Sequence, residues 1–202
     1  MLHKFDPRQL ERLERPERRQ LLDVEEIFSS IPLDAGQSVA DLGSGTGYFA
    51  LPLSRRLTAG KVYALDIADE MIEYLRHRVT EAGAANIEVI KCSGLDFPIP
   101  KGAMDGALVA FVLHEQDDQP GFLEKAMELL KPGGWLSVVE WEKKETKMGP
   151  PVAERIGRDD LKTLASIAGL DFVSAESTGD TVYVALLKRP EGHGTLGQKG
   201  VS

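Results

Sequence analysis

Apolar and polar positions alternate along the chain in a way that predicts strands and helices in regular succession after Gln37. Short runs of valine, leucine and alanine are each followed by a longer segment with apolar residues three and four positions apart. That spacing is typical of amphipathic helices. The strands expected are 38–42, 61–66, 87–92, 106–113 and 135–141, and the helices are 48–57, 68–82, 121–130 and 159–168. Strict alternation of the two predicts a parallel sheet with helices on both faces.

The last part of the region departs from this rhythm. Residues 171–178 and 181–188 are two strand-like runs around Gly179-Asp180, which predicts an antiparallel hairpin. Residues 142–157 carry lysine, glycine and proline but no apolar period, so we expect a long loop on the substrate side, at the carboxyl end of a strand. The fold class expected is therefore α/β, with a seven-stranded, mostly parallel sheet.

The rest of the chain is organised around this region, 37–188, as one domain. Residues 1–36 are expected to be a helical cover, with short helices broken at Pro16 and a further one near Asp23–Ser30 that Asp23 caps. Residues 189–202 are rich in glycine and have almost no apolar residues, which predicts a flexible tail. A length of 202 residues suits one domain of ordinary size.

Charge and composition limit the classes of molecule that the protein is expected to bind. The chain has 24 basic and 32 acidic residues, a net charge of −8, which disfavours nucleic acid as a partner. Its longest apolar run, Ala107 to Leu113, is far shorter than the roughly 20 residues that span a bilayer. The single cysteine, Cys92, can form neither an intrachain disulfide nor a zinc site. We expect a cytoplasmic monomer or homodimer with a small-molecule partner and no membrane insertion.

Candidate chemistry begins with a glycine cluster at the end of the first strand, Asp41-Leu42-Gly43-Ser44-Gly45-Thr46-Gly47. In an open parallel sheet this is a ligand-binding position. A dinucleotide fingerprint would place its third glycine at position 48, where this chain has Tyr48. Asp41 is unfavourable beside a pyrophosphate and suits a cationic group, whereas Asp66, at the end of the second strand, can accept ribose hydroxyls. The pattern indicates a nucleoside ligand that carries positive charge.

In these features the chain resembles class I S-adenosylmethionine-dependent methyltransferases, especially the small quinone-biosynthesis-like branch (methyltransferase type 11). The resemblance covers residues 37–188 and rests on the glycine cluster, Asp66, the Pro132-Gly133-Gly134 turn and the terminal hairpin. It implies a Rossmann-like fold, S-adenosylmethionine as cofactor, and methyl transfer to an oxygen, nitrogen or carbon of a small molecule.

The resemblance also implies residue roles. The glycine cluster would hold the methionine part of the cofactor, Asp66 the ribose, and the segment after the third strand the adenine. Many members place an acid at the position of Ser93, and here a serine hydroxyl or the N–H of Gly94 could bind the ring. The cofactor-binding residues implied are Asp41, Gly43, Ser44, Gly45, Gly47, Asp66, Ile67, Met71, Ser93, Gly94 and Ala110.

The candidate catalytic residue is His114, which is expected to close the fourth strand beside the sulfonium. Its ordinary pKa near 6.5 suits removal of a proton at neutral pH, although a histidine at a strand end can equally have a structural role. Glu140, Trp141 and Arg155 are weaker candidates for substrate contacts, with packing and surface roles as the alternatives. No metal ligand set is expected.

Two other functions stay open at this stage. A nucleotide-binding oxidoreductase shares the fold and would bind NAD, although Tyr48 argues against it. A non-catalytic module could retain an S-adenosylmethionine pocket as a sensor or an assembly surface. Methylation of nucleic-acid bases is disfavoured, because Phe111-Val112-Leu113-His114 stands where those enzymes carry an Asn/Asp-Pro-Pro-aromatic motif.

Overall fold

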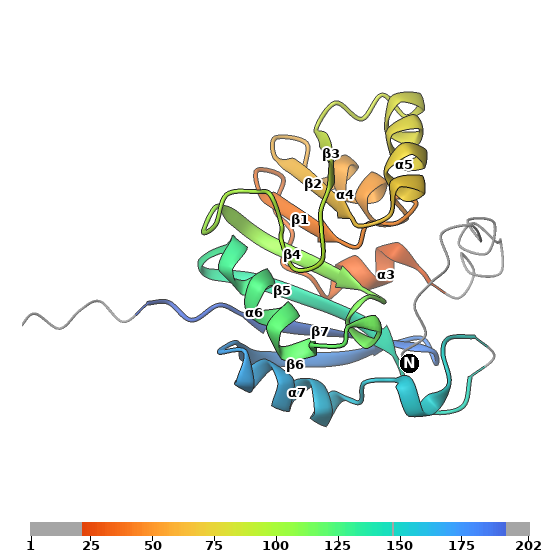
Figure 1. Ribbon diagram of the computed structural model, residues 1–202, viewed down its shortest axis with the longest axis vertical. Coiled ribbons are helices and arrows are strands. Elements are labelled where there is room, and N and C mark those ends of the chain that lie inside the picture. Colours follow the sequence, from red (N-terminus) through yellow and green to blue (C-terminus); the bar gives the residue numbers. More distant parts are fainter. Residues whose placement is uncertain (1–21, 147, 193–202) are drawn as a thin grey trace, which may run out of the picture.

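In the computed structural model, which describes residues 22–146 and 148–192, seven strands form a sheet in the order β3-β2-β1-β4-β5-β7-β6 (Figure 1). The pairs from β3 to β5 are parallel, and β7 runs antiparallel to both β5 and β6. The strands are β1 Ser38–Leu42, β2 Lys61–Asp66, β3 Ile87–Lys91, β4 Met104–Ala110, β5 Leu130–Trp141, β6 Asp171–Thr178 and β7 Val182–Lys188. The expected Rossmann-like α/β sheet with a C-terminal antiparallel hairpin is confirmed.

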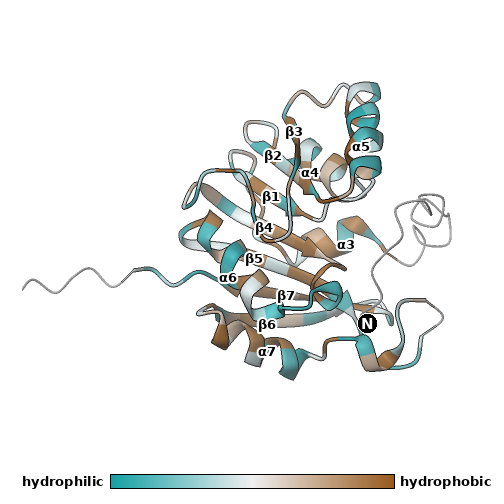
Figure 2. Cartoon of the chain, viewed as in Figure 1, coloured by the Kyte–Doolittle hydropathy of each residue, from teal (hydrophilic) through white to brown (hydrophobic). Residues whose placement is uncertain are grey.

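Helices cover the sheet on two faces, each with its own apolar core. One core joins α3 (Val24–Ser29), α4 (Ala50–Arg56) and α5 (Asp69–Glu81) to inward residues of the central strands. The other joins α6 (Gln119–Leu129) and α7 (Arg158–Ile167) to the opposite face. Figure 1 shows α6 and α7 grouped apart from α3 to α5, and Figure 2 shows apolar residues along β4 and mostly polar residues on α5.

The alternation of side chains in β1 explains how one short strand serves both cores. Val39 packs with the α3–α5 core, whereas Ala40 and Leu42 pack with the α6–α7 core. A strand buried on both faces carries a continuous apolar run, and the sequence pattern reflects this. No helix in the described part of the chain, 22–146 and 148–192, has the length and apolar character needed to cross a membrane.

The strand order places a topological switch point at the carboxyl ends of β1 and β4. Chain connections diverge on either side of β1, which pairs with β2 on one edge and with β4 on the other. In open α/β sheets ligands bind at this kind of topological switch point. The glycine cluster follows β1 directly, Asp66 ends β2, and the turn with His114 follows β4.

Three strand predictions need correction. The fourth strand ends at Ala110 rather than Leu113, because Phe111 takes a positive φ of 60° and the chain turns into the 3-10 helix η2, Leu113–Glu115. The third strand ends one residue earlier than expected, at Lys91. The expected Pro132-Gly133-Gly134 turn lies inside β5, which begins at Leu130 rather than at residue 135, and the register with β4 shifts there between Met104↔Leu130 and Gly106↔Trp135.

The four helices predicted after Gln37 are present, with ends one or two residues from the expected bounds. Helix α7 begins after Gly157, one residue before the expected start at 159, and the carboxylate of Asp160 accepts the N–H of Gly157. Asp23 caps α3 as expected, accepting the N–H groups of Glu25 and Glu26. The expectations for residues 1–21 and for the tail beyond Gly192 lie outside the described residues.

Candidate functional site

The glycine cluster folds back over the end of β2. The N–H groups of Gly43 and Ser44 both donate to the carbonyl of Leu65, at 2.8 and 2.9 Å. Gly43, Gly45 and Gly47 have φ values of 80°, 51° and 82°, a region in which L-residues are strained. A Cβ on Gly43 would lie 2.4 Å from Val112, and one on Gly47 2.4 Å from Leu75, whereas a Cβ on Gly45 would meet nothing within 4 Å.

These glycines therefore have two different roles. Gly43 and Gly47 allow the loop to pack against the chain after β4 and against α5. Gly45 borders open space, where the backbone can approach a ligand closely.

Two buried carboxylates flank this open space. Asp66 accepts the N–H of Gly45 on Oδ2 at 2.8 Å and the N–H of Ala68 on Oδ1 at 2.9 Å. Asp41 is only 1% exposed, and burial, together with the nearby charge of Asp66, raises its pKa to about 7 against the weaker effect of a backbone hydrogen bond from Ala50. Burial also raises the pKa of Asp66. The loop is thus a place where added positive charge is favourable.

Two buried oxygens in the loop have no hydrogen-bond partner within the protein. They are Oδ2 of Asp41 and Oγ of Ser44. A buried acceptor without a donor is costly, so such atoms indicate a group that binds there. The ammonium group of S-adenosylmethionine suits the Asp41 oxygen, and its ribose hydroxyls suit Asp66, which retains free acceptor capacity. The residues fit this cofactor, whereas the buried carboxylate of Asp41 opposes the pyrophosphate of NAD.

The segment expected to meet adenine is open to solvent at its edge. Ile67 is 61% exposed, and Gly94 has a φ of 57° with nothing near its would-be Cβ. Met71 is 3% exposed and packs in α5, so the structure places it in the core rather than at the surface. Ala110, at the end of β4, is half-buried.

Sequence reasoning overlooked Asp96, which bridges to Ser93 through paired backbone hydrogen bonds of 3.4 and 3.0 Å. Burial, the charge of Asp66 and that of Asp96 raise the pKa of the neighbouring Cys92 to about 11. Asp96 thus supplies an acid near the position where Ser93 lacks one. The signal in the sequence that could have identified Asp96 is its position, three residues after Ser93.

His114 does not lie on β4 but on η2, where it pairs with Glu140 of β5. Its Nδ1 lies 2.8 Å from Oε2 of Glu140, and its backbone N–H donates to Oε1 at 3.1 Å. The two residues are 5% and 0% exposed. Burial lowers the pKa of His114, but the hydrogen bond and charge of Glu140, with the charges of Glu115 and Glu154, raise it above its ordinary value. The structure therefore joins two residues that the sequence offered separately.

Trp141 is the last residue of β5, and Arg155 lies in the substrate-side loop that follows it, residues 142–157. The Arg155 guanidinium lies over the Trp141 ring at 5.9 Å, and Trp141 packs against Phe111 with ring centroids 4.8 Å apart. Arg155 is 4% exposed. It donates four hydrogen bonds of 2.7 to 3.0 Å to the backbone carbonyls of Glu142, Lys144, Met148 and Pro150. Arg155 thus holds the loop together, and the substrate contact expected for it stays a prediction.

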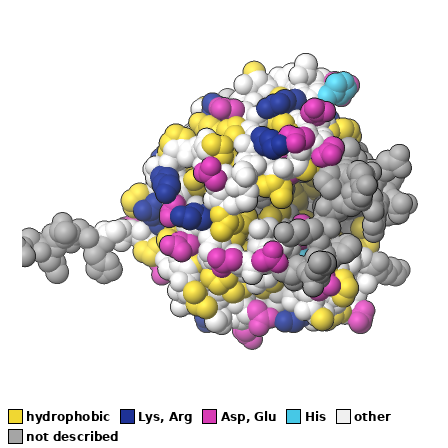
Figure 3. All heavy atoms as spheres, in the orientation of Figure 1, with side chains coloured by type: hydrophobic (Ala, Val, Ile, Leu, Met, Phe, Trp, Pro, Cys, Tyr) yellow, Lys and Arg dark blue, Asp and Glu magenta, His cyan; other side chains and the backbone are white. Residues whose placement is uncertain are grey.

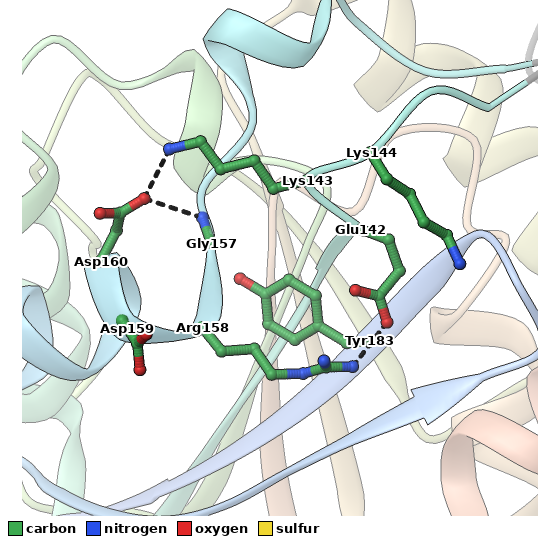
Figure 4. Close-up of a pocket in the computed structure, with 8 residues that line it drawn as sticks. All are labelled: Glu142, Lys143, Lys144, Gly157, Arg158, Asp159, Asp160 and Tyr183. Carbon is green, nitrogen blue, oxygen red and sulfur yellow. Dashed lines mark hydrogen bonds and ion pairs between the residues drawn. The ribbon is translucent and has the colours of Figure 1, made fainter.

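A hollow of about 530 Å³ lies between the start of this loop and the start of α7 (Figure 4). Its charged groups neutralise one another: Lys143 pairs with Asp160 at 2.6 Å, and Arg158 pairs with Glu142 at 2.5 Å and with Ser177 at 2.7 Å. This arrangement braces the start of α7 and presents no single sign of charge to a ligand. In the described part of the chain, no three His, Cys, Asp or Glu side chains come together in a way that could hold a metal ion.

Known proteins share this architecture. A methyltransferase-domain family model matches residues 39–134. The crystal structure of an S-adenosylmethionine-dependent methyltransferase from Aquifex aeolicus superposes with a TM-score of 0.87 and 31% identity, over 92% of this chain and 99% of that one.

Two curated relatives match over a shorter region. The ubiquinone/menaquinone biosynthesis C-methyltransferase UbiE of Pseudomonas putida is 32% identical over 116 residues, covering 56% of this chain and 45% of the relative. The demethylmenaquinone methyltransferase of Lactococcus lactis is 31% identical over 106 residues, covering 52% and 42%. The chain therefore spans less than half the length of these two relatives. Because the Aquifex protein is matched over almost its whole length, the chain belongs to the class I S-adenosylmethionine-dependent methyltransferases, and S-adenosylmethionine is its cofactor.

Proposed function

We propose that this protein transfers the methyl group of S-adenosylmethionine to a hydroxylated aromatic small molecule, at a ring carbon or at the hydroxyl oxygen. The observation that carries the proposal is the meeting, at neighbouring strand ends, of a loop that fits the cofactor and a buried His114–Glu140 pair. Val112, two residues before His114, lies against Gly43 of that loop, so the two parts of the site are in contact.

The chemistry divides between cofactor and protein. When bound, S-adenosylmethionine supplies an electrophilic methyl group and keeps the electron pair of its broken carbon–sulfur bond, leaving as S-adenosylhomocysteine. Asp41 offers a carboxylate to the ammonium group, and Asp66 holds the ribose. His114 takes the proton of the acceptor hydroxyl, and the resulting phenolate is nucleophilic at its oxygen and at the adjacent ring carbons. When the ring carbon takes the methyl group, that carbon then loses its C–H proton to water and the oxygen takes up a proton, which restores the aromatic hydroxyl. Alignment and proton removal are the main contributions that such a displacement needs from a protein.

The choice of acceptor class rests on two supports. The printed names of the two curated relatives refer to quinone rings, and the reduced form of a quinone is a hydroxylated aromatic ring. In addition, Figure 3 shows apolar side chains around a hollow on the face it presents, a surface that suits an apolar ring better than a highly charged acceptor.

The cofactor is tested first, by isothermal titration with S-adenosylhomocysteine and, separately, with NAD. We expect micromolar binding of S-adenosylhomocysteine alone. Binding of NAD in its place would favour the oxidoreductase.

The activity test uses S-adenosylmethionine with an isotopically labelled methyl group and a prenylated 1,4-naphthohydroquinone, with simple phenols and primary amines beside it. Mass spectrometry and NMR of the product distinguish carbon, oxygen and nitrogen methylation. Cofactor binding without turnover of any acceptor would instead support a non-catalytic module, and labelled amine products would move the acceptor to the nitrogen class.

The same proposal includes the setting of the enzyme. We propose a cytoplasmic location, since the composition includes a single cysteine, and a monomer or homodimer in which residues 1–36 cover the domain 37–188 and residues 189–202 form the tail. Light scattering after size-exclusion chromatography measures the assembly. Limited proteolysis with mass spectrometry tests the two boundaries, which we expect to be cut before the domain itself.

A further inference from the structure

The carboxylate of Glu140 holds His114 at two points. One oxygen accepts the backbone N–H at 3.1 Å, and the other lies 2.8 Å from Nδ1 of the ring. A carboxylate is an acceptor only, so Nδ1 carries the proton of this bond. With Nδ1 engaged and the ring buried, Nε2 is left as the nitrogen with a free lone pair. This arrangement fixes both the orientation and the tautomer of the imidazole.

The backbone before His114 is strained in a way that creates this contact. After Ala110 pairs with Val139, the N–H of Phe111 still donates to Val139 at 2.9 Å, but its φ of 60° ends the strand. A left-handed conformation is unfavourable for a non-glycine residue. The chain then turns through η2 and presents the N–H of His114 to Glu140. Strain of this kind in a buried aromatic residue points to a functional constraint.

The charged groups around His114 all raise its pKa, and only burial opposes them. Burial lowers the pKa of His114, whereas Glu140 of β5, Glu115 of η2 and Glu154 of the 3-10 helix η3 (Val152–Glu154) all raise it. Tyr183 of β7 lies beside Glu140 in the sheet, but its hydroxyl donates to the carbonyl of Ile156 at 2.9 Å. Burial and the charge of Glu140 raise the pKa of Tyr183, so that phenol stays neutral. Glu140 is therefore available to His114.

We propose that Glu140 is the positioning residue of the reaction: it holds Nδ1–H of His114 so that Nε2 accepts the proton of the methyl acceptor. The inference rests on the proposed function. In the proton step, the O–H bond of the acceptor breaks with its electron pair left on oxygen, and an N–H bond forms at Nε2. The imidazolium that results is paired with Glu140 and later gives its proton to water.

The first experiment needs no variant. In the full-length protein labelled with ¹⁵N-histidine and saturated with S-adenosylhomocysteine, NMR reports which ring nitrogen of His114 carries the proton across a pH titration. We expect Nδ1 to be protonated and Nε2 bare above the pKa of His114. A proton on Nε2, with Nδ1 bare, would overturn the proposal.

The second experiment compares Glu140→Gln, Glu140→Asp and the control Glu88→Gln, which removes a glutamate that pairs with Lys61 on the far edge of the sheet. Loss of the Glu140 charge lowers the pKa of His114, so the low-pH limb of kcat/KM should move to lower pH. The plateau should fall about tenfold or more, a fraction of the roughly 10²–10⁴-fold that a general base contributes. Glu140→Asp retains the negative charge, so its pH profile should lie between those of Glu140→Gln and the wild type. The control should match the wild type.

The readouts separate the two proposals. Absence of S-adenosylhomocysteine binding or of wild-type turnover counts against the proposed function. A turning-over wild type with an unchanged profile for Glu140→Gln counts against the positioning role alone. If Glu140→Gln fails to fold, as judged by near-ultraviolet circular dichroism, the wild-type NMR titration and Glu140→Asp decide the question. In folded variants, titration with S-adenosylhomocysteine should give wild-type affinity.

Discussion

The N–H of Gly45 donates a hydrogen bond to Oδ2 of Asp66 across 2.8 Å, which joins the glycine cluster to the end of β2. Asp66 also accepts the N–H of Ala68, and each oxygen retains capacity for a further donor. We expect Asp66→Ala to weaken S-adenosylhomocysteine binding at least tenfold, because hydrogen bonds to charged groups each contribute about 1.5–3 kcal/mol. Isothermal titration measures the change.

The matched control for this variant is Asp69→Ala. Asp69 is an exposed acid three residues later that pairs with Lys91 on the surface, so its loss should leave cofactor affinity at the wild-type value. Equal affinities for Asp66→Ala and the wild type would show that ribose binds elsewhere.

The glycines of the cluster should respond differently to alanine. Gly45→Ala adds a methyl group to open space at a φ of 51°, so we expect a stability loss of about 1–2 kcal/mol and a clear loss of S-adenosylhomocysteine affinity. Gly43→Ala drives its Cβ to 2.4 Å from the β-branched Val112, which should lower the thermal midpoint further. Scanning calorimetry and titration together compare them. Wild-type affinity in Gly45→Ala would mean that the open space is not the cofactor's.

Cofactor binding should depend on pH through Asp41. Its pKa of about 7 in the free protein means that much of this carboxyl is protonated in mildly acidic solution. A cationic ligand favours the ionised form, so binding should release a proton, and affinity should rise with pH up to about 7 and then level off. Titration in two buffers of different ionisation enthalpy measures the proton count. Asp41→Asn should abolish the release, and an unchanged count in that variant would refute the linkage.

The same group sets a stability trend with a definite sign. Because the folded-state pKa of Asp41 is raised from 3.8 to about 7, the folded protein holds this proton more tightly than the unfolded chain. The contribution is fully present below pH about 4 and is lost as pH rises through 7. Wild-type protein and Asp41→Asn should therefore differ more in free energy of unfolding at pH 8 than at pH 5, with Asn the more favourable at pH 8. Urea unfolding at the two pH values checks this.

Arg155 should control the order of the loop between β5 and α7. Arg155→Lys keeps the charge but cannot reproduce four hydrogen bonds from a planar guanidinium or its stacking over Trp141. We expect a loss of about 1–3 kcal/mol in stability and faster trypsin cleavage after Lys143 and Lys144. Arg56→Lys, at an exposed ion pair with Glu25, is the control. Equal cleavage rates in the two variants would assign the loop's order to other contacts.

Local pattern was enough to locate most of the elements. Strands 38–42 and 61–66 have the bounds that their apolar runs predict, because both are short, buried and ended by glycine or an acid. The run from Ala107 to Leu113 misled, since an apolar stretch does not reveal where the backbone changes conformation. The strand ends before Phe111, whose ring packs against Phe49 and Trp141, and both of these residues are distant from it in sequence.

The α/β order of elements, the glycine cluster and the acids at the ends of two strands can be read from the amino-acid sequence, because these features depend on local spacing. The tertiary structure decided which side chains meet. His114 and Glu140 are 26 positions apart and come together because β4 and β5 are neighbours and the chain turns at Phe111. The role of Arg155 in the loop also depends on the folded structure. A buried guanidinium must donate all its hydrogen bonds, and only the folded loop brings the acceptor carbonyls around it.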